Sequence, residues 1–224
     1  MNLVKIATLV FFLSTVILSA QEINQLDPDG KRHGIWTKNF DNTEVIRYKG
    51  EFFHGKEIGE FKFYKNIKNK AVLSAVKRFN KENNIAEVSF FTSTGKVIST
   101  GKMDGKTYID TWKYYQKNND NLLILENFDH LGKLSGERLV YYENGQIAEK
   151  QHYISGDLNG EVVLYSEKGV VLKSFVYEKG ELHGISKIFN GKGELLIEGA
   201  YKLGKKYGVW KYYENAKLKE EKRF

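Results

Sequence analysis

Residues 136–160 show the pattern of apolar and polar positions that organises the chain. The run Arg138-Leu139-Val140-Tyr141-Tyr142 is rich in strand-forming residues. Glu143-Asn144-Gly145 follows, and Asn-Gly is a strong hairpin signal because both turn residues tolerate a positive φ. Residues 146–153 predict the returning strand, and residues 155–160 are expected to turn the chain into the next hairpin.

The same pattern recurs every 24 residues in the C-terminal half. Two glycine columns and two aromatic columns stay in register. They are Gly132, Gly156, Gly180 and Gly204; Gly136, Gly160, Gly184 and Gly208; Tyr153, Tyr177 and Tyr201; and Tyr141, Tyr165, Phe189 and Tyr213. A period of this length indicates an array of stacked supersecondary units rather than a globule with one central core.

The period continues toward the N-terminus in weaker form. Taking the second glycine of each unit as a register mark gives eight units, at Gly34, Gly59, Ala86, Asp110, Gly136, Gly160, Gly184 and Gly208. Units three and four keep their aromatic residues but replace the glycine pair, which puts a regular bend there in question. The longer steps of units two and four predict longer turns at residues 66–70 and 116–121.

The predicted fold is all-β: an elongated array of about eight stacked antiparallel β-hairpins with a period of about 24. A single hairpin is marginal in water, so stacking must supply the partner of each strand. The array is expected to be one domain over residues 27–224, after a short N-terminal segment at 21–26. The glycine pairs are expected to take positive φ or to allow close backbone approach.

One motif resembles a known family. The pattern Tyr-x-x-Gly-x-x-x-Gly followed by Trp-x-Tyr-Tyr, seen best from Tyr201 to Tyr213, resembles the bacterial MORN-repeat-variant family. The resemblance covers nearly all of the chain after residue 20. It implies antiparallel hairpin arrays that act as interaction or scaffolding modules, and some members carry an antitoxin label. Related repeats have been linked to membrane lipids, and no catalytic motif belongs to the repeat.

Residues 1–20 have the features of a secretory signal peptide. Lys5 precedes an apolar stretch from Ile6 to Leu18, and Ala20 stands before the expected cut. The protein is therefore expected to be exported, and to be periplasmic, on the outer surface or secreted; an uncleaved anchor is the alternative. The chain has no cysteine, so neither bacterial lipid attachment through cysteine nor a disulfide is expected.

The charge of the chain does not change the predicted fold or indicate a specific partner. The net charge is +7, from 35 basic and 28 acidic residues that are interspersed along the chain. A nucleic-acid binder concentrates its basic residues, so no nucleic-acid partner is expected. Three lysine-rich clusters are interpreted as solvated turns, with anionic lipid binding as the alternative. They are Lys65, Lys68 and Lys70; Lys202, Lys205 and Lys206; and Lys217, Lys219, Lys222 and Arg223.

No residue pattern predicts a catalytic, cofactor or metal site. Trp36, Trp112 and Trp210 share one column, two residues after the register mark, and are interpreted as packing residues rather than a glycan-stacking platform. The histidines, His33, His54, His130, His152 and His183, do not converge by spacing. Glu60, Glu137 and Glu161 follow the register mark and are expected to pair with nearby lysines. An enzyme is therefore not expected, and neither is a cofactor.

The sequence favours a non-enzymatic, exported, monomeric module that binds another protein as a scaffold. An antitoxin or immunity protein is a narrower version, which export disfavours for a cytoplasmic toxin but leaves open for an envelope toxin. The alternatives are a module that binds an envelope glycan and one that binds an anionic membrane. The charged C-terminal strand, residues 218–224, is expected to protect the open edge of the array from pairing with another chain.

Overall fold

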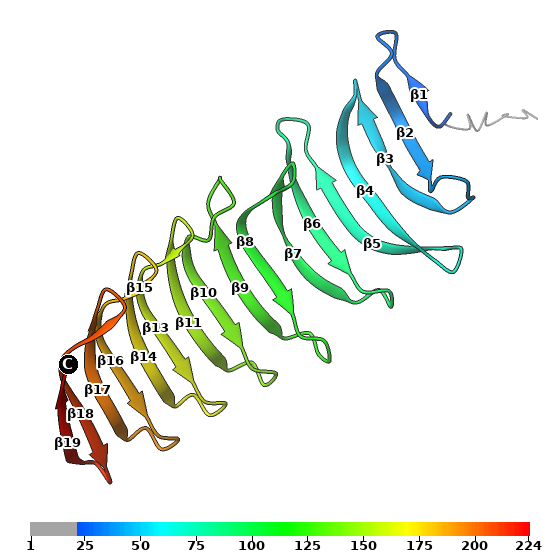
Figure 1. Cartoon of the computed structure of the whole chain (residues 1–224). Helices are drawn as coiled ribbons and strands as arrows, with labels where there is room; N and C mark the ends of the chain where they lie inside the picture. Colours follow the sequence, from blue (N-terminus) through cyan, green and yellow to red (C-terminus); the bar gives the residue numbers. More distant parts are fainter. Residues whose placement is uncertain (1–21) are drawn as a thin grey trace, which may run out of the picture.

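Residues 22–224, the part of the chain that the computed structural model describes, form one open antiparallel sheet. The strands lie side by side in chain order, so β1 and β19 stand at opposite ends of an elongated array (Figure 1). The expected signal peptide lies outside the described residues. Residues 22–224 contain no helix, and hence none long and apolar enough to cross a membrane.

Nineteen strands make up the sheet. They are β1 (Gln25–Leu26), β2 (Arg32–Asn39), β3 (Ile46–Phe53), β4 (Lys56–Ile67), β5 (Lys70–Phe79), β6 (Ile85–Phe91), β7 (Val97–Asp104), β8 (Thr107–Tyr115), β9 (Leu122–Phe128), β10 (Gly136–Tyr141), β11 (Ile147–Ile154), β12 (Asp157–Leu158), β13 (Gly160–Tyr165), β14 (Val171–Glu178), β15 (Glu181–Leu182), β16 (Gly184–Phe189), β17 (Leu195–Lys202), β18 (Lys205–Glu214) and β19 (Lys217–Arg223).

Strands that are neighbours in the sequence pair as hairpins, which confirms the all-β hairpin array. Two strands of only two residues, β12 and β15, begin the returning pass that β13 and β16 continue. The sheet starts earlier than expected, because Gln25 pairs with His33 and Leu26 with Arg32. Residues 25–26 therefore belong to the array rather than to a separate segment before residue 27.

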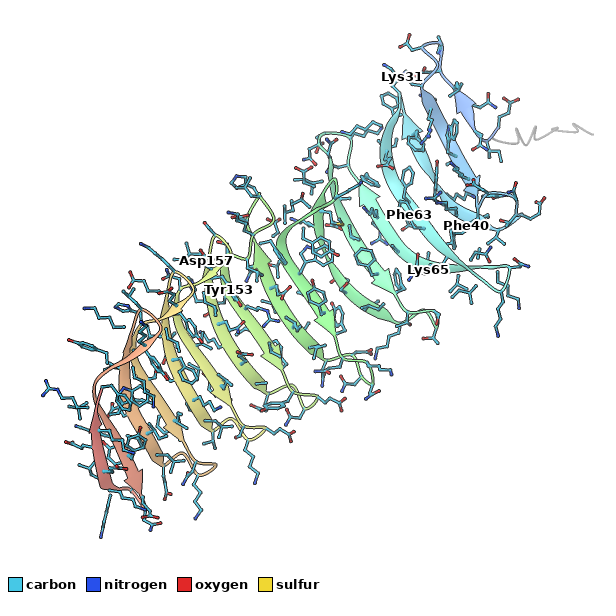
Figure 2. The ribbon with its side chains drawn as sticks, viewed as in Figure 1. Lys31, Phe40, Phe63, Lys65, Tyr153 and Asp157 are labelled. Atoms are coloured by element: carbon cyan, nitrogen blue, oxygen red, sulfur yellow. The ribbon has the colours of Figure 1, made fainter. Side chains whose placement is uncertain are left out.

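The turns along one long edge differ from the prediction. Figure 2 shows this edge at Lys31 and Asp157, opposite the edge that carries Lys65. We expected residues 155–160 to form the connection, but Ser155-Gly156 alone forms it, and Ile154 already pairs with Asp157. Both turn residues have positive φ, 51° and 97°, which defines the type I′ turn that suits twisted strands. Lys179-Gly180 and Leu203-Gly204 repeat the same turn.

The turns along the opposite edge are a different type. In the Glu143-Asn144-Gly145 loop only Gly145 has a positive φ, 84°, and its N–H donates to the carbonyl of Tyr142 at 2.9 Å. This is a three-residue loop closed by a left-handed glycine, so the predicted hairpin turn at these residues is confirmed, with a positive φ at Gly145 alone. The extra residues of unit two lengthen the strands instead of the turn, because Lys68-Asn69 closes β4 onto β5 with two positive φ angles. The longer turn at 116–121 is confirmed.

The backbone takes an unusual conformation at the second glycine of each pair. Gly160, Gly184 and Gly208 have φ of 108°, 94° and 71°, which confirms the expected left-handed backbone. Asp110 occupies the same position with φ of 58°, so the bend survives the loss of glycine in unit four. At Ala86 the backbone is ordinary, and the β5–β6 ladder runs without a register shift. The bend is therefore absent only at the unit-three mark among the described units.

One face of the sheet, which we call the aromatic face, carries the residues two and four positions after each register mark. Three of its bulky rings lie flat against a glycine on the neighbouring strand: Phe61 on Gly50, Trp112 on Gly101 and Trp210 on Gly199. A Cβ added to these glycines would lie 2.3, 2.3 and 2.2 Å from the ring. Glycine is thus required there because the ring occupies the space of a side chain.

The pair of residues that face each other here, one two positions after the register mark and the other on the preceding strand, changes along the array. Lys77 pairs with Val88, and the register of the flanking pairs places Glu126 opposite Arg138. In unit seven the order of sizes is reversed, since Phe175 stands opposite Ser186. In several units a small residue thus opposes a large one, and in one unit an acid opposes a base, whereas Lys77 and Val88 follow neither pattern.

Candidate binding surfaces

The aromatic face is filled by its own side chains. Trp112 is fully buried and stacks on Tyr108 with 4.0 Å between ring centroids. Trp210 is buried as well, at 3 % exposure, whereas Trp36 is half-buried. The packing interpretation of the tryptophan column is confirmed for Trp112 and Trp210. Their buried rings cannot stack against a sugar.

A polar cluster interrupts the aromatic face near its middle. Arg138 Nε donates to Glu126 Oε1 at 2.8 Å, and its Nη1 donates to Gln151 Oε1 at 3.0 Å. Tyr153 also donates to Gln151, at 3.1 Å. Burial raises the pKa of Tyr114 to about 12, and the Glu126 carboxylate adds to this shift. These contacts join members of the cluster to one another, so the cluster serves packing. The sequence did not predict it because its members come from different units.

The opposite face, which we call the mixed face, carries the residues one, three and five positions after each mark. A groove of about 630 Å³ crosses β13, β14 and β16 on this face. Val163 is buried at 8 % exposure, while Ile185 is 56 % exposed. The groove is lined by Glu161, Val163, Tyr165, Val171, Ser174, Val176, Ile185, Lys187, Phe189 and Gly193. The groove combines aliphatic and aromatic surface with one acid and one base.

The carboxylates that follow the register marks pair as expected in two of three units. Glu60 contacts Lys62 at 3.2 Å and Arg78 at 3.1 Å, and the Lys62 ammonium holds the pKa of Glu60 below its usual range. Glu137 pairs with Lys150 and raises the pKa of that lysine. Glu161 differs, because it accepts a hydrogen bond from Ser174 Oγ at 2.7 Å instead of facing a lysine.

The lysine-rich clusters are exposed, and two of them pair locally. In the C-terminal cluster Lys219 contacts Glu214 at 2.8 Å and Lys222 contacts Glu220 at 3.2 Å. Lys206 lies over the ring of Trp210 at 4.2 Å. These contacts place Lys219 and Lys222 beside carboxylates and Lys206 over an aromatic ring.

Two of the five histidines converge, contrary to the expectation from spacing. His33 in β2 and His54 in the β3–β4 turn have ring centroids 5.0 Å apart. His54 Nδ1 lies 2.7 Å from Oδ2 of Asp27, whose side chain is only 3 % exposed. The N–H of Lys31, donating to Oδ1 at 2.8 Å, lowers the pKa of Asp27, and His54 lowers it further. The repeat register could have predicted this group, because it places all three residues at the same long edge of neighbouring hairpins.

No protein-family model matches the chain, and no curated protein matches it. The resemblance to MORN repeats stays a prediction.

Proposed function

We propose that this chain is a non-enzymatic, exported protein of eight MORN-like hairpin units that binds another protein through the groove of the mixed face. The 24-residue period and its aromatic and glycine columns support the repeat assignment. Export rests on the signal-like pattern of residues 1–20.

The observation that carries this proposal is the difference between the two faces. The aromatic face buries Phe61, Trp112 and Trp210 against strand glycines. The mixed face has no such cover at β13–β16, where Ile185 remains 56 % exposed beside the groove floor. A partly apolar centre with polar neighbours is the composition of a protein-binding patch.

The charged groups of the groove suit recognition better than catalysis. Glu161 accepts a hydrogen bond from Ser174, and Lys187 lies 3.6 Å from Glu198. Each group is therefore paired within the protein, and no second carboxylate is recorded in contact with Glu161 among residues 22–224. An acid and a base on opposite strands can instead orient a partner of complementary charge.

The antitoxin- or immunity-like role is the narrower version of this proposal. It applies to a toxin of the cell envelope, because an exported protein does not meet a cytoplasmic toxin.

An envelope glycan or an anionic membrane is the alternative partner, and it has less support. Two of the three tryptophans are buried, and the lysines of the C-terminal cluster pair with acids. Lipid binding through lysines would fall strongly with added salt, since it depends on screened charge. Liposome binding that persisted in high salt would exclude this mechanism.

The test is affinity capture under native conditions with three baits: the parent chain, Ile185→Glu and Ile98→Glu. Both isoleucines are exposed, at 56 % and 44 %, but Ile98 lies in β7, away from the groove. We expect the parent and Ile98→Glu to retain one protein that Ile185→Glu loses, and the purified partner to reproduce this difference. Capture that repeatedly returned nothing, or that ignored Ile185→Glu, would contradict the proposal.

A further inference from the structure

The cluster of Asp27, His33 and His54 lies at the N-terminal end of the array and plays no part in the proposed groove. One carboxylate oxygen and one ring nitrogen from each histidine lie within 4.8 Å of one another. The residues come from three places: the turn after β1, strand β2 and the turn between β3 and β4. A group built from separate turns is held by the register of the sheet rather than by local sequence.

The Asp27 carboxylate is preorganised. Its Oδ1 accepts the backbone N–H groups of Asp29 at 3.0 Å and Lys31 at 2.8 Å. These two bonds fix the side chain, which is 3 % exposed, and leave Oδ2 directed at His54. Its Oδ2 is therefore available to a cation.

His33 supplies the observation that the fold alone does not explain. Its Nδ1 is buried and has no hydrogen-bond partner among the described residues. A buried polar atom without a partner costs free energy, and native proteins rarely retain one without a reason. The His33 ring lies 5.5 Å from the ring of Phe53 and 5.0 Å from that of His54, and one of its nitrogens belongs to the group of ligand atoms within 4.8 Å of one another.

We propose that Asp27, His33 and His54 bind a divalent first-row transition ion, with Zn²⁺ as the representative. Two imidazoles and one carboxylate are typical zinc ligands, and three protein ligands leave one position for water or a further ligand. The ion replaces the proton between His54 Nδ1 and Asp27 Oδ2, and it coordinates a ring nitrogen of His33. Zinc bonds its nitrogen ligands at roughly 2.0–2.1 Å, so binding requires the side chains to adjust around the ion, and the His54 ring is exposed.

The array contains a second copy of this corner without the histidines. Asp129 has the same turn, since its Oδ1 accepts the N–H groups of Leu131 and Lys133, both at 2.9 Å. The N–H of Gly55 donates to the carbonyl of Arg32, and the N–H of Gly156 donates to the carbonyl of Leu134, both at 2.8 Å. These equivalent bonds show which residues of the two sites correspond. Ser135 and Ser155 thereby stand where His33 and His54 stand. The turn chemistry recurs, and only the first corner carries ligands.

Metal binding would join the first three strands of the sheet. The turn after β1 and the turn between β3 and β4 would share one ion across β2. Since the ion binds only the folded corner, it stabilises that corner by mass action. The site would thus fasten the N-terminal edge, where β1 contributes only two residue pairs.

Calorimetric titration with ZnCl₂ tests the proposal on the untagged full chain after chelator treatment. We expect one ion per chain. His33→Ala, His54→Ala and Asp27→Asn should each weaken binding tenfold or more, while circular dichroism confirms that each variant folds. Asp129→Asn and His183→Ala are matched controls, because they change the same turn position and the same register position without the other ligands. They should leave the affinity unchanged.

A second experiment introduces the two histidines at the equivalent site around Asp129. Ser135→His with Ser155→His should add a second bound ion per chain, and Asp129→Asn in that background should remove it. His54 already shows that histidine accepts this turn position, with φ of 47°. Absence of stoichiometric Zn²⁺ uptake by the parent would overturn the proposal, as would uptake that His33→Ala and His54→Ala leave intact.

Discussion

The half of the array with the more regular sequence repeat has fewer buried hydrophobic residues than the half with the irregular repeat. Residues 132–213 keep the strict 24-residue period, whereas residues 34–112 follow it loosely. Of the buried hydrophobic residues in the described chain, eleven lie between Val45 and Trp112 and only three, Val162, Val163 and Trp210, lie beyond. The irregular half therefore holds the main core, around Val88, Met103 and Trp112.

The difference teaches that the repeat signature specifies turns rather than core. The repeated 24-residue period marks glycines with positive φ at the turns and bends of the hairpins. Burial depends instead on which two residues face each other across neighbouring strands of the aromatic face. Trp112 packs its large ring on Gly101, whereas the smaller ring of Phe175 faces Ser186. Ser186 Oγ is buried and has no hydrogen-bond partner among residues 22–224, which weakens that unit further.

The largest predicted effect is the loss of Trp112. Trp112→Ala should destabilise the array by about 3–5 kcal/mol, because it removes a fully buried ring and leaves a cavity. Val162→Ala, at the same position two units later, should cost about 1 kcal/mol, since fewer buried atoms are lost. Urea unfolding followed by circular dichroism measures both. Equal losses at the two sites would break the comparison between the halves.

Replacing the facing residues Phe175 and Ser186 should convert unit seven into a unit with a tryptophan packed on a glycine. Ser186→Trp alone should destabilise by roughly 1–3 kcal/mol, because Phe175 already fills the space across the strand. Adding Phe175→Gly recreates the Gly199–Trp210 arrangement and should recover most of the loss. A double-mutant cycle on urea midpoints measures the coupling. Purely additive effects would mean that the two columns do not compensate each other.

Replacing a register glycine should cost less than losing Trp112. Gly160→Val or Gly184→Val should destabilise by roughly 1–3 kcal/mol, since φ of 108° and 94° is strained for a β-branched residue. Gly191→Val is the matched control, because its φ is ordinary and nothing lies within 4 Å of an added Cβ. The same thermal melting point for all three variants would show that these bends do not need glycine.

The smallest effect on stability is expected at the C-terminal edge, where every residue of β19 is exposed. Replacing Glu220, Lys222 and Arg223 together by Thr should leave the melting point nearly unchanged but allow edge-to-edge pairing, because charge on an open edge opposes it. Light scattering should show concentration-dependent association of this variant and a monomeric parent. Association of the parent would contradict the protective role of the charges.

The sequence was sufficient for the hairpins and their approximate register, because strand formers and glycine pairs act locally. It did not predict the two turn types: Ser155-Gly156 forms a two-residue turn in which both residues have positive φ, whereas in the Glu143-Asn144-Gly145 loop only Gly145 does. It could not predict the Glu126–Arg138 pair or the Asp27–His54 contact, because both join separate hairpins. Such contacts depend on which residues stand opposite across strands, and one insertion changes that alignment.

Removing one whole period tests the array most directly. Deletion of residues 161–184 joins Gly160 to Ile185, restores equivalent neighbours and keeps the Glu126–Arg138 pair. Deletion of residues 161–172 removes half a period and pairs unlike strands. Because each hairpin contacts only its neighbours, the first variant should unfold cooperatively with native-like circular dichroism, and the second should not. If both deletions unfold the protein alike, the chain is not an array of interchangeable hairpins.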